Sequence, residues 1–431
     1  MAVIRQQCLF SWEDDVEPLG DLERLQLVIT HLPDEELMRL LELERGNGRD
    51  DYPIRAMWNS ILAGSVFQHK SVESLRRELN RNGQLRHMCG FRSDVPPAWV
   101  YSRFLRKLES KLEEVKAVFD NLADELYELL PDFGEDIVID SKAIPSFASC
   151  EPKNKTRDGR RDTDAKYGAK TYKGKRADGT TWEKVTYWFG YKLHLIVDAI
   201  YELPIEFGLT VPVHDVVQGR KMVDELKKDR PHILERCETM SGDKAYDDTE
   251  LIEELWDEHG IKPVIDIRQT WRDDDTRLVE GFENVVYNNE GTVFCHCMVT
   301  GVDHQMAFAG FEPDRETLKF RTPCHHYGIE CKGAAVCPIK AKSIRIKIDE
   351  DRRIFTPMAR CSYTWQDKYD RRTAVERVNS RLDVSFGFEE HTIRGLKKMT
   401  LYCSLALIVM LVMAVGRIKE GQMDKIRSLV A

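Results

Sequence analysis

The sequence predicts a mixed α/β protein in which helices flank a central sheet, an all-α region precedes the sheet, and a β-rich insertion interrupts it. Three observations support this fold class. Residues 17–130 space their apolar positions three and four apart, as helices do. Residues 136–267 alternate apolar and polar positions in short runs separated by helical stretches, which indicates strands and helices in turn. Residues 268–356 carry short β-like runs among a cluster of cysteines.

Residues 1–130 are expected to form a helical N-terminal region. The segments DDYPIRAMWNSILAG and SVESLRRELNRNGQLRHMCGF show the helical spacing, and so does the long segment that starts at PPAWVYSRF. Four arginines in the second segment stand among polar residues, as on a helix that faces a DNA groove: Arg76, Arg77, Arg81 and Arg86. The sequence leaves two roles open for this region, recognition of DNA ends or a helical cap that helps dimerisation.

The predicted sheet begins with an apolar strand at 136–140, within EDIVIDSKAIPSF. The basic stretch 151–182 is low in hydrophobicity and is expected to be a surface loop. Two alternating segments, 185–200 and 202–211, then predict a hairpin, so that part of the sheet is antiparallel. The next elements are expected in the order helix, strand, helix, strand, at 216–229, 240–243, 247–260 and 261–267.

The helical pattern resumes at 365–383, and the apolar segment 401–415 is expected to close the core. That segment is shorter than the ~20 residues that a bilayer requires, so a buried helix is favoured over a membrane span. The predicted domains are the helical region, a catalytic domain of 131–267 and 357–416, the insertion at 268–356, and a C-terminal tail at 417–431.

Composition and charge narrow the class of protein. With 42% hydrophobic and 32% charged residues among 431, the chain is globular, and neither disordered nor fibrous. Its formal net charge of −9 argues against a protein that coats nucleic acid, yet two stretches are basic. Residues 152–194 hold 12 Lys or Arg against 5 Asp or Glu, and residues 315–347 hold 8 against 2. Such stretches fit contact with phosphate at defined places. Eleven cysteines without an expected secretory signal indicate a reducing compartment.

Three carboxylates stand where a metal site needs them. Asp140 and Asp243 each follow a predicted strand, and ligand sites tend to lie at such strand ends. Glu376 shares one helical face with Tyr369 and Arg372, since residues at i, i+3 and i+7 lie within about 60° of one another. Taken singly, the aspartates could be turn caps and Glu376 a partner of Arg372. Together they offer the oxygen ligands that two Mg²⁺ or Mn²⁺ ions require for phosphodiester chemistry.

The motifs around these carboxylates resemble those of the DDE transposases of bacterial insertion sequences. DIVIDSKAI resembles the strand with the first Asp, and GDKAYDD the segment with the second. YDRRTAVE fits the Y-x2-R-x3-E signature of the subgroup with a β-rich insertion; FGYKLH, TIRGLKKM and the first two helical segments are also similar. The resemblance implies a ribonuclease H-like catalytic domain in which Asp140, Asp243 and Glu376 are catalytic and bind two Mg²⁺ or Mn²⁺ ions.

The resemblance also implies a set of DNA contacts. Tyr369 and Arg372 would hold phosphate near the scissile bond. The other expected contacts are Lys142, Lys192, His194, Lys244, Arg394 and Lys397. For His194, an ordinary strand histidine is an equal alternative.

One position departs from the signature. The subgroup carries a Lys seven residues after the Glu, where this sequence has Asp383. Either Arg381 or Lys397 would compensate, or the protein handles the DNA end differently. This departure bears on the hairpin-forming version of the chemistry, not on the metal site.

The cysteines of the insertion are a second candidate metal site. Zinc binds four Cys or His ligands at short spacings, and the expected set is Cys324, Cys331 and Cys337 with Cys297; Cys295 and His325 are alternatives for the fourth ligand. The C-x-C, C-x6-C and C-x5-C spacings are not standard for zinc. Free thiols are therefore the leading alternative.

The resemblance implies a DNA transposase that cuts phosphodiester bonds at insertion-sequence ends and joins the 3′ ends to target DNA. The expected partners are double-stranded DNA, as terminal repeats and target, and a second copy of the chain in the DNA complex; no membrane is expected. The expected location is the bacterial cytoplasm, at the nucleoid when bound to DNA. Two alternatives stay open: a ribonuclease H-like nuclease that cuts without joining, and a catalytically silent DNA-binding protein derived from a transposase.

Overall fold

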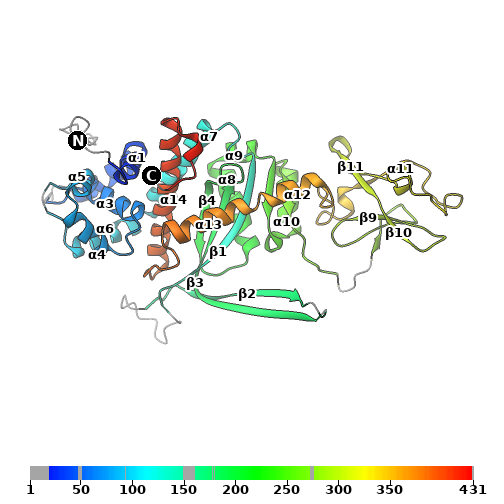
Figure 1. Ribbon diagram of the computed structural model, residues 1–431, viewed down its shortest axis with the longest axis horizontal. Helices are drawn as coiled ribbons and strands as arrows, with labels where there is room; N and C mark the ends of the chain where they lie inside the picture. Colours follow the sequence, from blue (N-terminus) through cyan, green and yellow to red (C-terminus); the bar gives the residue numbers. More distant parts are fainter. Residues whose placement is uncertain are drawn as a thin grey trace.

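The structure, a computed structural model, describes residues 19–46, 51–92, 94–148, 161–176, 178, 180–271 and 276–429. The molecule is elongated, with the helical region at one end, the main sheet in the middle and the insertion at the other end (Figure 1). The predicted mixed α/β architecture, with flanking helices and a mixed sheet, is confirmed.

The N-terminal region consists of helices in its described residues, as the apolar spacing predicts. They are α1 Leu22–His31, α2 Glu35–Arg45, α3 Ile54–Val66, α4 Val72–Arg81, α5 Gly83–Cys89, α6 Ala98–Glu109 and α7 Leu112–Leu129. Their apolar faces belong to the same hydrophobic core as the main sheet. The predicted boundary at residue 130 therefore separates regions that share a core, and it stays a prediction.

The main sheet contains β1 Asp136–Pro145, β2 Lys166–Lys175, β3 Thr181–Asp198, β4 Pro204–Thr210, β5 Thr239–Gly242 and β6 Lys262–Ile265. The strand order is β2-β3-β1-β5-β6, and β4 pairs with the inner half of β3. The pairs β1–β3 and β3–β4 are antiparallel, whereas the pairs β1–β5 and β5–β6 are parallel. The expected hairpin and the later strands are thus present in one mixed sheet.

The expected surface loop at 151–182 is wrong for part of its length. Residues 151–160 lie outside the described residues, but 166–175 form β2, which pairs with the outer half of β3 over ten residues, from Lys166–Gly190 to Lys175–Thr181. The two strands project from the body of the protein as a two-stranded arm (Figure 1). Because both faces of such an arm meet solvent, its low hydrophobicity does not exclude a strand.

Helices pack on the sheet between and after these strands. They are α8 Asp215–Asp229, α9 Pro231–Arg236, α10 Thr249–Glu253, α12 Tyr363–Asp370 and α13 Thr373–Ser385. α8 and α13 contact β1 and β3, and α12 contacts β5 and β6. α10 continues directly into a π-helical turn over Glu254–Glu258, so the helix expected at 247–260 is present in two parts.

Helix α14, Leu396–Lys419, joins the helical region to the sheet. It packs against α1, α3, α6 and α7 on one side of the molecule and against β4 on the other. Among the described helices it alone is long and apolar enough to cross a membrane, but 89% of its apolar window is buried inside the fold. α14 is therefore a core helix, as the sequence predicts for 401–415.

The insertion has a hydrophobic core of its own. Its strands are β7 Arg277–Leu278, β8 Val285–Tyr287, β9 Val293–His296 and β10 Asp303–Gln305 in one sheet, and β11 Ala307–Glu312, β12 Thr317–Arg321 and β13 Ser343–Lys347 in another, with a short helix α11 at Pro323–His326. The buried side chains between these sheets, Phe320 and Val293 among them, form a cluster separate from the main core. The cluster also includes Ile267, and the bounds 268–356 of the insertion stay a prediction.

Candidate active site

Asp140 and Asp243 lie side by side because β1 and β5 pair in parallel. The register pairs Ile139 with Gly242, so each aspartate directly follows the last paired residue of its strand. The sequence predicted that β1 ends at Asp140, and this prediction is wrong. The strand continues to Pro145 along β3, and only its parallel partner β5 stops at the site.

Backbone N–H groups orient both carboxylates. The N–H of Ser141 donates to Asp140 at 2.7 Å, and the N–H of Ala245 donates to Asp243 at 2.8 Å. Burial and the nearby charge of Asp243 raise the pKa of Asp140 to about 6, although Arg372 and the Ser141 N–H oppose the shift. Two carboxylates that repel each other in a partly buried place are a suitable site for a cation.

The third carboxylate, Glu376, stands on the second of two consecutive helices, not on one continuous helix as predicted. α12 ends at Asp370 and α13 begins at Thr373. The junction is tightened by bonds between residues three apart, such as the Arg372 N–H to the Tyr369 carbonyl at 2.9 Å. Tyr369 stacks on Trp365, with ring centroids 4.7 Å apart, and the two rings fix the end of α12.

Arg372 is the charge that links the three carboxylates. Its Nη2 lies 3.0 Å from Oε1 of Glu376, and its guanidinium lies over the Tyr369 ring, 5.7 Å from the centroid. Burial lowers the pKa of Arg372, but Tyr369, Glu376 and the two aspartates together raise it above its ordinary value. Within the described ranges, no three Asp, Glu, His or Cys side chains already stand at metal-binding spacing. Glu376 is half-exposed and paired with Arg372 instead.

Comparisons with known proteins identify the family. A model of the transposase DDE domain matches residues 132–412, which is most of the chain. The protein belongs to the transposase DDE domain family. A search of curated proteins found no match. A cryo-EM structure of the piggyBac transposase synaptic complex with hairpin DNA aligns over 96% of this chain and 80% of that chain, at 14% identity and a TM-score of 0.38. A TM-score of 0.38 is too low to carry an argument about the fold.

All of the other predicted DNA contacts lie within the matched residues 132–412, and the structure gives several of them acidic partners. Lys142 pairs with Asp383, the residue that departs from the signature. Lys192 lies 2.7 Å from Asp215. The positive charge beside Asp383 therefore comes from β1, whereas Arg381, one of the two expected compensating residues, binds Glu202 at 3.1 Å.

The remaining predicted contacts differ in exposure. Lys244 and Lys397 are exposed, and Lys244 lies 3.5 Å from Asp266. Arg394 lies over the Phe147 ring, 4.5 Å from its centroid. His194 is fully buried, and its Nε2 lies 3.2 Å from the Thr210 hydroxyl. This burial favours the strand-histidine alternative for His194.

The arginines of the helical region bind neighbouring residues. Arg76 and Arg81 pair with Glu73 and Glu78 three residues earlier on α4. The Arg77 Nε donates to the Glu73 carbonyl at 3.3 Å, and Arg86 donates to the carbonyls of Leu79 and Asn80. These contacts leave both expected roles of the region open.

A buried aspartate that sequence reasoning missed, Asp136, holds the end of helix α12, which carries Tyr369. Asp136 is 3% exposed and accepts bonds from Lys368 Nζ at 2.6 Å, Arg371 at 2.9 Å and Thr239 at 2.6 Å. Lys368 and Arg371 flank Tyr369 and precede Arg372, so this carboxylate fastens the end of α12 to the start of β1. The signal in the sequence was an acidic residue at the first position of an apolar strand.

Gly190 of the FGYKLH motif permits the close pairing of β3 with β1. A Cβ at this position would lie 2.2 Å from the Ile144 carbonyl oxygen and 2.6 Å from the Ser146 nitrogen. Backbone atoms cannot rotate aside, so we expect Gly190→Ala to destabilise the protein by about 1–3 kcal/mol, measured by urea unfolding. The control Gly64→Ala, in helix α3 with a nearest contact of 3.4 Å, should be neutral or stabilising. Equal midpoints for the two variants would contradict this account.

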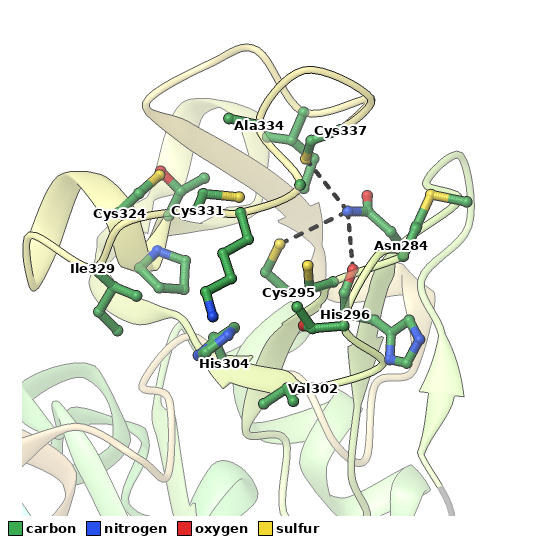
Figure 2. Close-up of a pocket in the computed structure, with 18 of the residues that line it drawn as sticks. Asn284, Cys295, His296, Val302, His304, Cys324, Ile329, Cys331, Ala334 and Cys337 are labelled. Carbon is green, nitrogen blue, oxygen red and sulfur yellow. Dashed lines mark hydrogen bonds between the residues drawn. The ribbon is translucent and has the colours of Figure 1, made fainter.

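The predicted zinc ligands gather around one cavity in the insertion. Five cysteines line it, Cys295, Cys297, Cys324, Cys331 and Cys337, together with His296, His304 and His325 (Figure 2). Every member of the expected ligand set thus lines the same cavity. In the described residues, no three of these side chains are close enough together to hold a metal ion.

Proposed function

We propose that the protein is a DNA transposase that cuts phosphodiester bonds at the ends of a bacterial insertion sequence and joins the 3′ ends to target DNA. The observation that carries the proposal is the pair Asp140 and Asp243 on adjacent parallel strands, close enough to Arg372 to act on its charge, while Arg372 pairs with Glu376. The family match over residues 132–412 supports the same chemistry.

We propose a ribonuclease H-like fold for the catalytic domain of 131–267 and 357–416. Its support is the topology: three antiparallel strands, β4, β3 and β1, followed by two parallel strands, β5 and β6, with helices between them. The subgroup with a β-rich insertion is supported by the two small sheets that stand between Asp243 and Glu376.

Asp140, Asp243 and Glu376 would hold divalent metal, Mg²⁺ or Mn²⁺. The donor set fits, because the aspartates are adjacent, partly buried and mutually repelling, and hard cations take carboxylate oxygens. When bound, such ions supply Lewis acidity to an attacking oxygen and a leaving oxygen of the phosphodiester. Glu376 has to exchange its partner Arg372 for metal.

That exchange gives Arg372 a role of its own. Once released from Glu376, its guanidinium is free to donate two parallel bonds to a phosphate beside the aspartates. Tyr369, whose hydroxyl lies 3.4 Å from Asp266, stands next to it and would help to position the same phosphate. We propose further contacts with the sugar–phosphate backbone of the DNA, which fix the register of the DNA without reading its sequence. The residues are Lys142, Lys192, Lys244, Arg394 and Lys397.

The two-stranded arm is proposed as an additional DNA contact. Strand alternation and the β2–β3 register place Lys166, Lys170 and Lys184 on one face of the arm, all exposed. On the same face, Trp188 and Trp182 fold over Gly168 and Gly174, where a Cβ would lie within 2.3 Å and 2.6 Å of the indole rings. An isolated two-stranded ribbon is only marginally stable, and the major groove admits one of this kind.

Replacing the three arm lysines should weaken DNA binding. The test is a triple variant, Lys166→Gln with Lys170→Gln and Lys184→Gln. The slope of the logarithm of the binding constant against the logarithm of salt concentration should become shallower by up to about 0.9 for each lost phosphate contact. Fluorescence anisotropy with duplex DNA at several salt concentrations measures this slope. The matched control replaces Lys221, Lys227 and Lys228 on α8, which changes the net charge equally. Identical losses in both triple variants would mean that only net charge matters and would remove the arm from the interface.

The proposed function is tested by incubating the purified protein with Mg²⁺ or Mn²⁺ and labelled duplex DNA that carries the end of the element. Metal-dependent nicking at the end, with products joined to a second DNA, is the expected result. Nicking without joined products would favour the nuclease alternative. Binding without nicking in either metal would favour the silent DNA-binding alternative. The proposed partner in the DNA complex is a second copy of the chain, and the proposed location is the bacterial cytoplasm.

A further inference from the structure

The loop at 327–342 of the insertion is held in place with very little apolar packing. It contains no helix or strand over sixteen residues. Ile339 is its one side chain that packs against the hydrophobic core of the insertion, whereas Tyr327, Ile329 and Val336 are exposed. A connection of this length inside a small module needs another source of stability, and in small modules a structural metal often supplies it.

Cysteines from two directions meet at this loop. Cys295 and Cys297 belong to one edge of β9 and the turn after it, and as residues two apart in an extended segment they face the same side. Cys331 and Cys337 come from the loop itself. In Figure 2 the sulfur atoms of Cys295, Cys331 and Cys337 lie around the same space, a cavity of about 500 Å³.

Donors from the protein already surround these sulfur atoms. The buried Asn284 donates through Nδ2 to Cys295 at 3.7 Å and to Cys337 at 3.6 Å, so one amide holds two thiols. Its Oδ1 is buried and has no hydrogen-bond partner among the residues that the structure describes. Cys297 accepts from the backbone N–H groups of Val299, Thr300 and Gly333. Such N–H···S bonds orient and stabilise thiolates that bind a metal.

We propose that Cys295, Cys297, Cys331 and Cys337 bind one structural Zn²⁺, which fastens the loop at 327–342 to β9. Four thiolates are the ligand set of closed tetrahedral zinc sites, with Zn–S distances near 2.3 Å. In the described residues the sulfur atoms line the cavity without a closed shell, so the side chains have to turn inward as the metal binds and the thiols lose their protons to solvent.

This set replaces one residue of the set expected from the sequence. Cys324 is left out of the set because its sulfur already has local partners, His325 Nδ1 at 3.4 Å and the Thr322 hydroxyl at 3.6 Å, although it is near enough to help raise the pKa of Cys295. Cys295 takes its place, since it shares the Asn284 amide with Cys337. The inference does not depend on the proposed function.

The experiment measures zinc in the full-length protein purified without chelators, by plasma mass spectrometry. We expect one zinc per chain in the wild type and in two controls: Cys324→Ser, in the cavity, and Cys361→Ser, which lies outside it. Cys295→Ser and Cys337→Ser should each lose at least nine-tenths of the metal. Less than a tenth of a zinc per wild-type chain would overturn the proposal, and loss of zinc from Cys324→Ser would overturn the ligand set.

A second measurement does not depend on how the variants fold. Wild-type protein treated with a strong zinc chelator should release one equivalent of zinc, and limited proteolysis should then cut within 327–342 at least tenfold faster than in untreated protein. Proteolysis of this loop at the same rate with and without chelator would contradict a role of the metal in holding it.

Discussion

Asp140→Asn should reduce metal-dependent DNA cleavage far more than the roughly 10–100-fold that follows loss of a residue that only supports a metal ligand. The amide keeps the shape of the side chain and removes the charge that the metal requires. Asp243→Asn and Glu376→Gln should behave alike, because in the proposed site the three carboxylates act as one unit and their effects do not add. Initial rates of nicking at saturating Mg²⁺ and Mn²⁺ measure the loss.

Binding and folding controls separate this loss from damage to the protein. DNA affinity should be retained in all three variants, and Asp370→Asn, an exposed carboxylate on α12, should cut at the wild-type rate. A variant of Asp140, Asp243 or Glu376 that cuts at the wild-type rate would remove that residue from the site.

Metal-free Asp140→Asn should be at least as stable as the wild type above pH 6. Burial and Asp243 raise the pKa of Asp140 to about 6, which means that the folded state favours the neutral carboxyl. The wild type therefore loses stability as pH rises from about 4 to 6, and the amide removes that loss. Thermal unfolding with EDTA at pH 5 and pH 8 measures it. A lower melting temperature for the variant at pH 8 would show that the substitution damages the fold.

Local patterns predicted most elements of the main sheet and its helices, and chain order predicted that two aspartates follow strands. Alternation identified β3 and β4, and an apolar run identified β1. Adjacency of Asp140 and Asp243 depends on β1 and β5 being parallel neighbours, which the sequence only suggested. The family motifs supplied the remaining information.

Three features were not predictable from the local pattern of apolar residues. The sequence of the arm predicts a loop, because a ribbon that meets solvent on both faces has no hydrophobic pattern to separate it from a loop. The break between α12 and α13 contains neither Gly nor Pro, so helical spacing continued through it. The pair of Lys142 with Asp383 joins residues 241 positions apart, and only the packing of α13 against β1 brings them together.

Asp136→Asn is expected to destabilise the protein by about 3 kcal/mol, the lower end of the range for breaking a buried ion pair. The substitution removes the charge that binds Lys368 and Arg371, but the Arg371 side chain is 40% exposed and can be solvated, so the cost stays near that lower end. Urea unfolding at pH 7 measures the change. The matched control is Asp367→Asn, which removes the other partner of Arg371 at the surface and should cost less than about 1 kcal/mol.

A positioning role for Asp136 has a second consequence, beyond stability. Because its partners flank Tyr369 and precede Arg372, a loosened α12 should lower the rate of DNA cleavage even where the variant is fully folded. At 20 °C without urea, cleavage by Asp136→Asn should fall at least about tenfold, with DNA affinity nearly unchanged, whereas Asp367→Asn should cut normally. A folded Asp136→Asn variant with the wild-type cleavage rate would limit this buried carboxylate to a purely structural role. The positions of Tyr369 and Arg372 would then have to be fixed by other contacts, such as the stacking of Tyr369 on Trp365.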